Sequence, residues 1–216
     1  MTMLSINTNV GALKAASASY SVNKSMETSM QRLSTGLRVN SAADDAAGHQ
    51  IANRMSAEIM GLKQAIKNAA DAQALMGTAE GAIEEIQVML LRMRELAVQS
   101  SNATNSAADK ASLQLEAAQL ESEIQRTANN TTWAGTVLLN GTFSGDGDSA
   151  GRTFQIGSDS GQTIELSIPE LTATALTIGY SVALSIGSFT GAQSAIVTID
   201  DGMSTLANVR ANIAAK

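Results

Sequence analysis

The side chains that could perform acid–base, nucleophilic or metal chemistry are few in this chain. His49 is the only histidine and cysteine is absent, which excludes Cys/His zinc sites, disulfides and thiol nucleophiles. Asp44 and Asp45 could orient His49, but an HExxH zinc site needs a second histidine, so we interpret His49 as a surface or packing residue. Residues 145–148, Gly-Asp-Gly-Asp, look like the start of a calcium loop, yet the later glutamate and the spaced oxygen ligands are missing. We therefore expect no catalytic, cofactor-binding or metal site.

Recognition of another protein is the chemistry that residues 91–100, LRMRELAVQS, could provide. If this stretch is helical, four of its side chains point away from the apolar row to which Met93 belongs: Arg92, Glu95, Leu96 and Gln99. A leucine exposed between an arginine and a glutamine can anchor a protein interface. An ordinary charged helix face with one exposed leucine is the alternative, and the pattern alone leaves both open.

A long helix must position this segment. Apolar residues recur every seven positions from residue 55 to residue 97, and a second row at the same spacing misses only at Glu58. A seam sustained in this way is typical of a coiled coil. Asp44 and Asp45 can cap its start, and a helix from about Asp44 to Ser100 would be roughly 85 Å long. The side chains that we assign to seam contacts are Met55, Leu62, Met76, Ile83, Ile86, Leu90 and Met93.

Shorter helices are predicted on both sides of the long one. Residues 10–33 carry apolar side chains at helical spacing, and residues 107–128 repeat them in steps of four and three. A short Asn/Ser/Thr loop joins the long helix to the 107–128 helix, which predicts an antiparallel hairpin. Residues 199–213 place their large apolar side chains roughly on one face, so the chain ends in a further helix.

The composition changes near Trp133 toward glycine, threonine and β-branched residues. Residues 153–157 and 163–168 alternate apolar and polar side chains around a turn sequence, which predicts a β-hairpin. Residues 176–178 and 182–186 are further strand candidates. The predicted fold class is therefore mainly α, a long coiled-coil rod or bundle with a small β-hairpin region.

Charge and hydropathy exclude other classes of protein. The net charge is -6 and only 3% of the residues are aromatic, so the chain lacks both the basic field and the stacking side chains of a nucleic-acid binder. The first thirty residues lack the apolar core of a signal peptide, and no apolar run approaches the roughly 18 residues of a membrane helix. We expect neither nucleic-acid binding nor membrane insertion. The long seam exceeds what one short helix can cover, so the missing apolar surface must come from other subunits or from further chain.

Several stretches of this sequence resemble bacterial flagellin, the filament protein. They are SINTNV at 5–10, QRLSTGLRVNSAADDAAG at 31–48, IANRM at 51–55, NAADA at 68–72, RMRELAVQS at 92–100, TTWAGTVLLNG at 131–141 and FQIGSDSGQTIEL at 154–166. They follow the order and spacing of the family over about residues 1–170. The end of the chain, from residue 192, is similar to the start of the family's C-terminal core helix.

The resemblance implies a structural subunit and no enzyme. Flagellins are exported unfolded by the flagellar type III apparatus and polymerise outside the cell under a filament cap, next to the hook-junction proteins. Terminal helices, disordered in the free monomer, pair as coiled coils. The resemblance also implies that the vertebrate flagellin-sensing Toll-like receptor contacts Arg92, Leu96 and Glu116, in an area that includes Glu95 and Gln99 and makes filament contacts.

The resemblance also divides the chain. Residues 1–40 correspond to a channel-lining helix, 41–172 to the helical core with its β-hairpin, 173–190 to a short variable segment and 191–216 to the start of the C-terminal core helix. Family members continue beyond Lys216, and we expect poor polymerisation without those helices. A hook–filament junction protein is an alternative in the same export family. A flagellin-like metallopeptidase is a further alternative, which the short variable segment and the single histidine disfavour.

Overall fold

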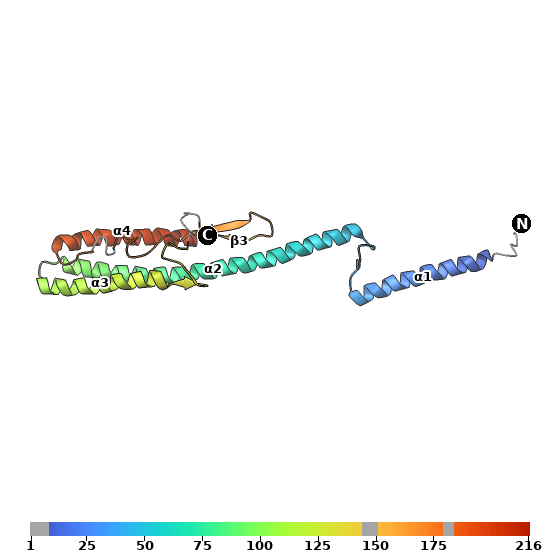
Figure 1. Cartoon of the computed structure of the whole chain (residues 1–216), viewed down its shortest axis with the longest axis horizontal. Helices are drawn as coiled ribbons and strands as arrows, with labels where there is room; N and C mark the ends of the chain where they lie inside the picture. Colours follow the sequence, from blue (N-terminus) through green and yellow to red (C-terminus); the bar gives the residue numbers. More distant parts are fainter. Residues whose placement is uncertain (1–8, 144–150, 179–183) are drawn as a thin grey trace. The chain divides into compact units, whose positions relative to one another are not determined.

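The computed structural model describes residues 9–143, 151–178 and 184–216. These residues form two units, Met1–Met60 and Gly61–Lys216, and the second holds the core. The mainly α fold with small β pairs is confirmed (Figure 1). The helices are α1 (Val10–Thr35), α2 (Ala46–Ser100), α3 (Ala107–Asn130) and α4 (Phe189–Ala214), and the strands are β1 (Thr132–Trp133), β2 (Thr136–Val137), β3 (Arg152–Gln155) and β4 (Thr163–Leu166).

Helix α1 forms from local signals alone. The side chain of Asn9 accepts a hydrogen bond from the backbone N–H of Ala12, which satisfies one of the free donors of the first turn. At the other end, the N–H of Gly36 donates to the carbonyl of Arg32. None of the residues of α1 is buried. Its stability in a single chain therefore depends on propensity and capping, which support an isolated helix only marginally.

Two aspartates form hydrogen bonds at the start of α2, where the sequence predicts a cap. The Asp45 carboxylate accepts a hydrogen bond from the N–H of Gly48 at 2.9 Å, in the manner of a helix cap. The Asp44 carboxylate accepts from the N–H groups of Asn40 and Ser41 at 3.2 and 3.1 Å. These bonds, that of Asn40 first, lower the pKa of Asp44 below its usual value.

The core of the second unit lies between α2, α3 and α4. Arg92 of α2 bonds to Glu116 of α3, and Arg94 of α2 bonds to Asp200 of α4, so α2 has a neighbour on each side. Farther along α4, the guanidinium of Arg210 donates to the side chain of Gln87 at 2.9 Å. Because the later residue of α4 contacts the earlier residue of α2, the two helices are antiparallel. Helix α3 is antiparallel to α2 as well, as the short loop predicts. The largest buried side chains include Ile83, Ile86, Leu90, Met93, Leu96 and Phe143.

The loop between α2 and α3 supplies caps to both helices. The side-chain amide of Asn105 donates to the Gln99 carbonyl at 2.6 Å, which satisfies a free acceptor at the end of α2. Ser106 begins α3 with a capping box, because its hydroxyl accepts from the N–H of Asp109 while the Asp109 carboxylate accepts from the N–H of Ser106. The hydroxyl and N–H of Ser106 lower the pKa of Asp109.

The strands form two separate antiparallel pairs. The predicted hairpin is present, with Arg152 opposite Leu166 and Gln155 opposite Thr163 in β3 and β4. The side-chain amide of Asn68 donates to the Gln155 carbonyl at 3.0 Å and fixes this hairpin to α2. The β1–β2 pair was not predicted; its turn holds Ala134 and Gly135 at positive φ, where glycine is favoured but alanine is not.

The strand predictions for residues 176–178 and 182–186 are wrong where the structure describes them. Residues 176–178 form turns, in which the N–H of Ile178 donates to the Ala173 carbonyl. Residues 182 and 183 lie outside the described part, and residues 184–186 belong to none of the strands that the structure describes. The side chain of Gln114 satisfies two backbone groups of this segment, since it donates to the Leu184 carbonyl and accepts from the Ile186 N–H.

Neither a membrane helix nor a metal cluster is found in the described ranges. Within residues 9–143, 151–178 and 184–216, no helix combines the length and apolar character needed to cross a membrane. In the same ranges, no three His, Cys, Asp or Glu side chains gather as metal ligands. The Gly-Asp-Gly-Asp run at 145–148 lies outside the described residues, and His49 lies in the first turns of α2.

Candidate recognition surface on α2 and α3

The end of α2 is amphipathic with a wide buried face. Successive helical residues are rotated by about 100°, so Arg92 and Arg94 lie on nearly opposite sides of the helix. Between them lie Met93, Leu96 and Ala97, all with 0% exposure. The two arginines therefore mark the edges of the buried face, one toward α3 and one toward α4.

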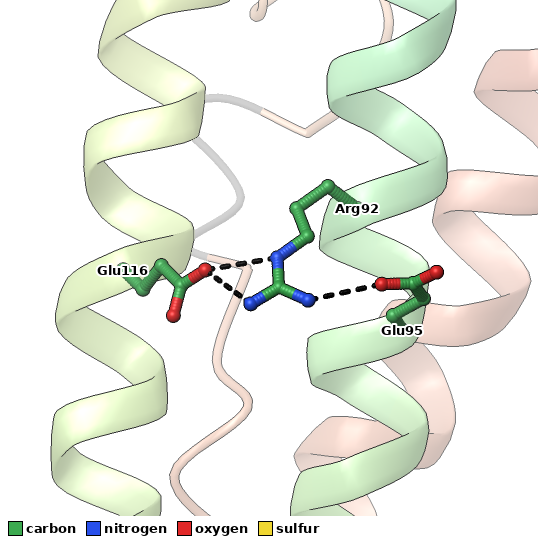
Figure 2. A network of polar contacts seen from close by, with 3 residues as sticks. All are labelled: Arg92, Glu95 and Glu116. Carbon is green, nitrogen blue, oxygen red and sulfur yellow. Dashed lines mark hydrogen bonds and ion pairs between the residues drawn. The ribbon is translucent and has the colours of Figure 1, made fainter.

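Arg92 is the centre of an exposed polar network that joins the two helices (Figure 2). Its Nε and Nη2 donate to one oxygen of Glu116 at 2.9 and 2.7 Å, and its Nη1 donates to Glu95 at 3.0 Å. The bonds to Glu116, and then those to Glu95, raise the pKa of Arg92 above its already high value. The guanidinium is thus fixed in orientation while about half of its side-chain surface stays open to solvent, at 48%.

The predicted exposure of Leu96 is wrong, because the leucine is fully buried. The prediction assumed one narrow seam, which would leave Leu96 outside. Helix α2 has two neighbours, however, so its buried face widens to include Leu96 beside Met93 and Ala97. Leu96 can therefore influence a contact at this surface only indirectly, by packing beneath the exposed side chains.

The other residues assigned to this surface are exposed. Glu95 and Gln99 both lie on the outer face of α2, and Glu95 keeps 70% of its side-chain surface in solvent. Glu116 faces them from α3 and is 45% exposed. The structure thus brings together Arg92, Glu95 and Glu116, with Gln99 one turn farther along α2 and its carbonyl engaged by the loop.

A separate groove between α2 and α3 lies nearer the start of α2 than this network does. It has a volume of about 850 Å3 and is lined by Met89 and Leu120 among other residues. Glu85, Glu123 and Arg126 add charge at its border, and Arg126 and Glu123 form an ion pair. The groove therefore combines apolar and charged side chains, as protein interfaces do.

The seven side chains assigned to the seam divide into two groups. Ile83, Ile86, Leu90 and Met93 are fully buried within the second unit, and Met76 is partly buried against the core. Met55 and Leu62 are 54% and 45% exposed. A strict heptad drifts by about 20° per repeat around a straight helix, so the early and late seam residues cannot share one face unless the helix supercoils. Whether the exposed pair forms seam contacts remains a prediction.

Sequence reasoning missed the polar contacts that hold α4 and the segment before it. Arg94 pairs with Asp200 at 2.7 Å, and Arg210 reaches Gln87 and Glu80. The Ser100 hydroxyl is buried and donates to the Ile186 carbonyl. These partners lie more than 80 residues apart along the chain, so no local pattern could have linked them.

Comparison with solved structures places the fold among flagellar proteins. Flagellin from Bacillus cereus superposes with a TM-score of 0.59 at 29% identity, over 69% of this chain and 81% of that one. A protein from Vibrio parahaemolyticus described as flagellar hook-associated shares the fold, with a TM-score of 0.65 at 17% identity over 81% and 88%. The fold alone therefore defines a class that includes filament and hook-associated proteins.

The sequence comparisons define the family within this class. Residues 6–144 match the model of the bacterial flagellin N-terminal helical region. Flagellin E from Vibrio cholerae is 44% identical over 176 residues, which cover 82% of this chain and 45% of that protein. The chain belongs to the bacterial flagellin family, and it spans less than half the length of this curated relative.

Proposed function

We propose that the chain is part of a structural subunit of the bacterial flagellar filament, and that it joins other copies through its apolar helix faces. The observation that carries the proposal is the exposure of large apolar side chains along α1 and the first half of α2. Among the described residues none before Ala65 is buried. The exposed side chains on α2 include Ile51, Met55, Ile59, Leu62 and Ile66.

Burial of these side chains between subunits supports assembly on energetic grounds. Each large apolar side chain removed from water contributes about 1.5–3 kcal/mol, and the exposed set would sum to a substantial association free energy. Contacts between unlike faces of identical subunits extend without closing, which produces a filament. We propose that such subunits leave the cell unfolded through the flagellar type III apparatus. They then assemble under the filament cap, beyond the hook-junction proteins, into the filament of the extracellular flagellum.

Incorporation into growing filaments tests this function. Labelled chain added with a full-length flagellin to short filament seeds should sediment with the filaments and decorate them in electron micrographs. Leu62→Asp should reduce incorporation at least about tenfold, because a charge would be placed in an apolar contact. Ser56→Asp is the matched control, since Ser56 is polar, exposed and outside the heptad rows. Equal incorporation of both variants and the parent chain would contradict the seam proposal.

We further propose that the free chain is recognised by the vertebrate flagellin-sensing Toll-like receptor through the surface around Arg92. The support is geometric: Arg92, Glu95 and Glu116 form an exposed charged cluster that joins α2 and α3, with the guanidinium fixed in orientation. Arginine with fixed geometry is frequent among the residues that dominate protein interfaces. Leu96 would support this surface from below.

Reporter cells that express the receptor test this second function. Arg92→Ala should raise the concentration needed for half-maximal signalling by at least about tenfold, which is typical of a central interface residue. Arg94→Ala is the matched control because Arg94 also forms one exposed ion pair, but on the side of α4. Helicity measured by circular dichroism should stay equal in both variants, since exposed ion pairs add little to stability. Equal signalling by the two variants would reject the assignment.

A further inference from the structure

In the turn that follows β2, two elements that could assist a reaction lie around one Asn-Gly pair. Asn140 and Gly141 form the only Asn-Gly sequence in the chain. Asparagine followed by glycine is the sequence in which the next backbone nitrogen reaches the side-chain carboxamide with the least steric hindrance, because glycine has no Cβ. Gly141 also has a φ of 83°, which few other residues adopt.

The first of these elements is a pair of donors on the carboxamide oxygen of Asn140. The N–H of Thr142 donates to Asn140 Oδ1 at 3.1 Å, and the Thr142 hydroxyl donates to the same atom at 2.6 Å. Attack on the carboxamide carbon would place negative charge on this oxygen. Donors already aimed at an atom where charge develops stabilise the transition state, as in an oxyanion hole. The same bonds hold the carboxamide folded toward the downstream backbone.

The second element is a carboxylate beside the glycine. Glu170 Oε2 lies 3.5 Å from the position that a Cβ on Gly141 would occupy. The segment that carries it is held just after Glu170, because the Leu171 N–H donates to the Leu139 carbonyl at 2.8 Å and the Thr172 hydroxyl donates to Glu170 Oε1 at 2.6 Å. Glu170 is exposed, and a carboxylate in this place can act as a proton acceptor.

We propose that Asn140 is a self-modification site, at which the fold accelerates deamidation through Thr142 and Glu170. The Gly141 nitrogen attacks Asn140 Cγ and forms a C–N bond, while Glu170 accepts the proton from that nitrogen. The Cγ–Nδ2 bond then breaks, and ammonia leaves with the proton returned by Glu170. Water opens the cyclic imide and leaves aspartate or isoaspartate at position 140. The net reaction consumes one water and releases one ammonia, and it adds a negative charge beside Glu170.

The rate of conversion in the folded chain tests this proposal. The purified chain and a synthetic peptide of residues 137–143 are incubated in the same mildly alkaline buffer, and peptide mapping by mass spectrometry follows aspartate and isoaspartate at position 140. Asn40 and Asn105 are each followed by serine, and their conversion rates serve as internal references in every sample. We expect the folded chain to convert Asn140 faster than the peptide does.

Two variants separate the roles of the neighbouring groups. Thr142→Val removes the hydroxyl donor with little change in shape, and Glu170→Gln removes the base but keeps the size. Each variant should slow conversion at position 140 by about tenfold and leave the conversion rates of Asn40 and Asn105 unchanged. A tenfold effect is smaller than the rate gain that one such group supplies in enzymes. In denaturant, the parent chain and both variants should fall to the peptide rate. A folded chain no faster than the peptide, or variants as fast as the parent chain, would overturn the proposal.

Discussion

Arg92 and Leu96, two neighbouring side chains of α2, lie in different environments. Arg92 and Leu96 lie about one turn apart on α2, yet Arg92 is exposed in a network with Glu116 and Leu96 has no exposed surface. The difference arises because the buried face of α2 is wide enough to contact both α3 and α4. A substitution at Arg92 therefore changes the surface, and a substitution at Leu96 changes the core.

Truncation of Leu96 should lower stability even though sequence reasoning assigned it to a surface. Leu96→Ala removes buried carbons and leaves a cavity, so we expect a loss of about 2–5 kcal/mol in the free energy of unfolding. Urea denaturation followed by circular dichroism measures this loss. Val98→Ala is the control, because Val98 is 48% exposed and its truncation should cost no more than about 0.5 kcal/mol. A loss for Leu96→Ala as small as that of the control would show that Leu96 is not buried in solution.

Among the elements, α3 depends most clearly on its cap. Ser106 and Asp109 satisfy each other's backbone N–H groups, and the carboxylate also lies at the positive end of the helix dipole. Removal of the Ser106 hydroxyl should cost about 1 kcal/mol. Because α3 carries Glu116, the cap also contributes to the geometry of the charged cluster.

The stabilising effect of Asp109 should depend on pH. Its pKa is lower in the folded chain than in the unfolded chain, mainly through the Ser106 hydroxyl. The contribution is therefore present above the unfolded value of about 3.9 and disappears as the pH falls through the lower folded value. Asp109→Asn should be less stable than the parent chain at neutral pH, and the difference should shrink below about pH 4. Thermal denaturation across this range measures it; a difference that stays constant to acid pH would contradict the prediction.

The sequence predicted those elements whose signals are local. The seven-residue periodicity predicted α2, the Asn/Ser/Thr loop predicted the hairpin with α3, and the alternation around residues 159–161 predicted the β3–β4 pair. The strand prediction for residues 176–178 failed because turn hydrogen bonds, such as that from the Ile178 N–H to the Ala173 carbonyl, override the strand propensity of these side chains; Thr177 even has a φ of 60°. The prediction for Leu96 failed because it assumed one narrow seam, whereas α2 packs against both α3 and α4 and its buried face is wider. The hydrogen bonds of Gln114 to the segment before α4 join residues 70 and 72 positions apart, which no local pattern links.

On the scale of the whole molecule, burial is confined to the second unit. Residues 9–64 include no buried side chain, whereas α2 from Ala79 onward contributes regularly spaced buried side chains to a continuous core with α3 and α4. The apolar side chains of α1, such as Leu13, Met26 and Leu33, are more than half exposed. One chain therefore stabilises its second unit by packing and its first unit only by local helical interactions.

Hydrogen exchange in dilute monomer should divide the chain at this point. Amides of α1 and of α2 before about residue 60 should exchange rapidly, because isolated helices without tertiary contacts open easily. Amides near Leu90 and Ile124, which are fully buried, should exchange only through larger openings. The same α1 amides should become protected when the chain is incorporated into filaments, since subunit contacts would then cover the apolar faces. Strong protection throughout α1 in the dilute monomer would mean that this helix needs no neighbour, and the argument for assembly through it would fail.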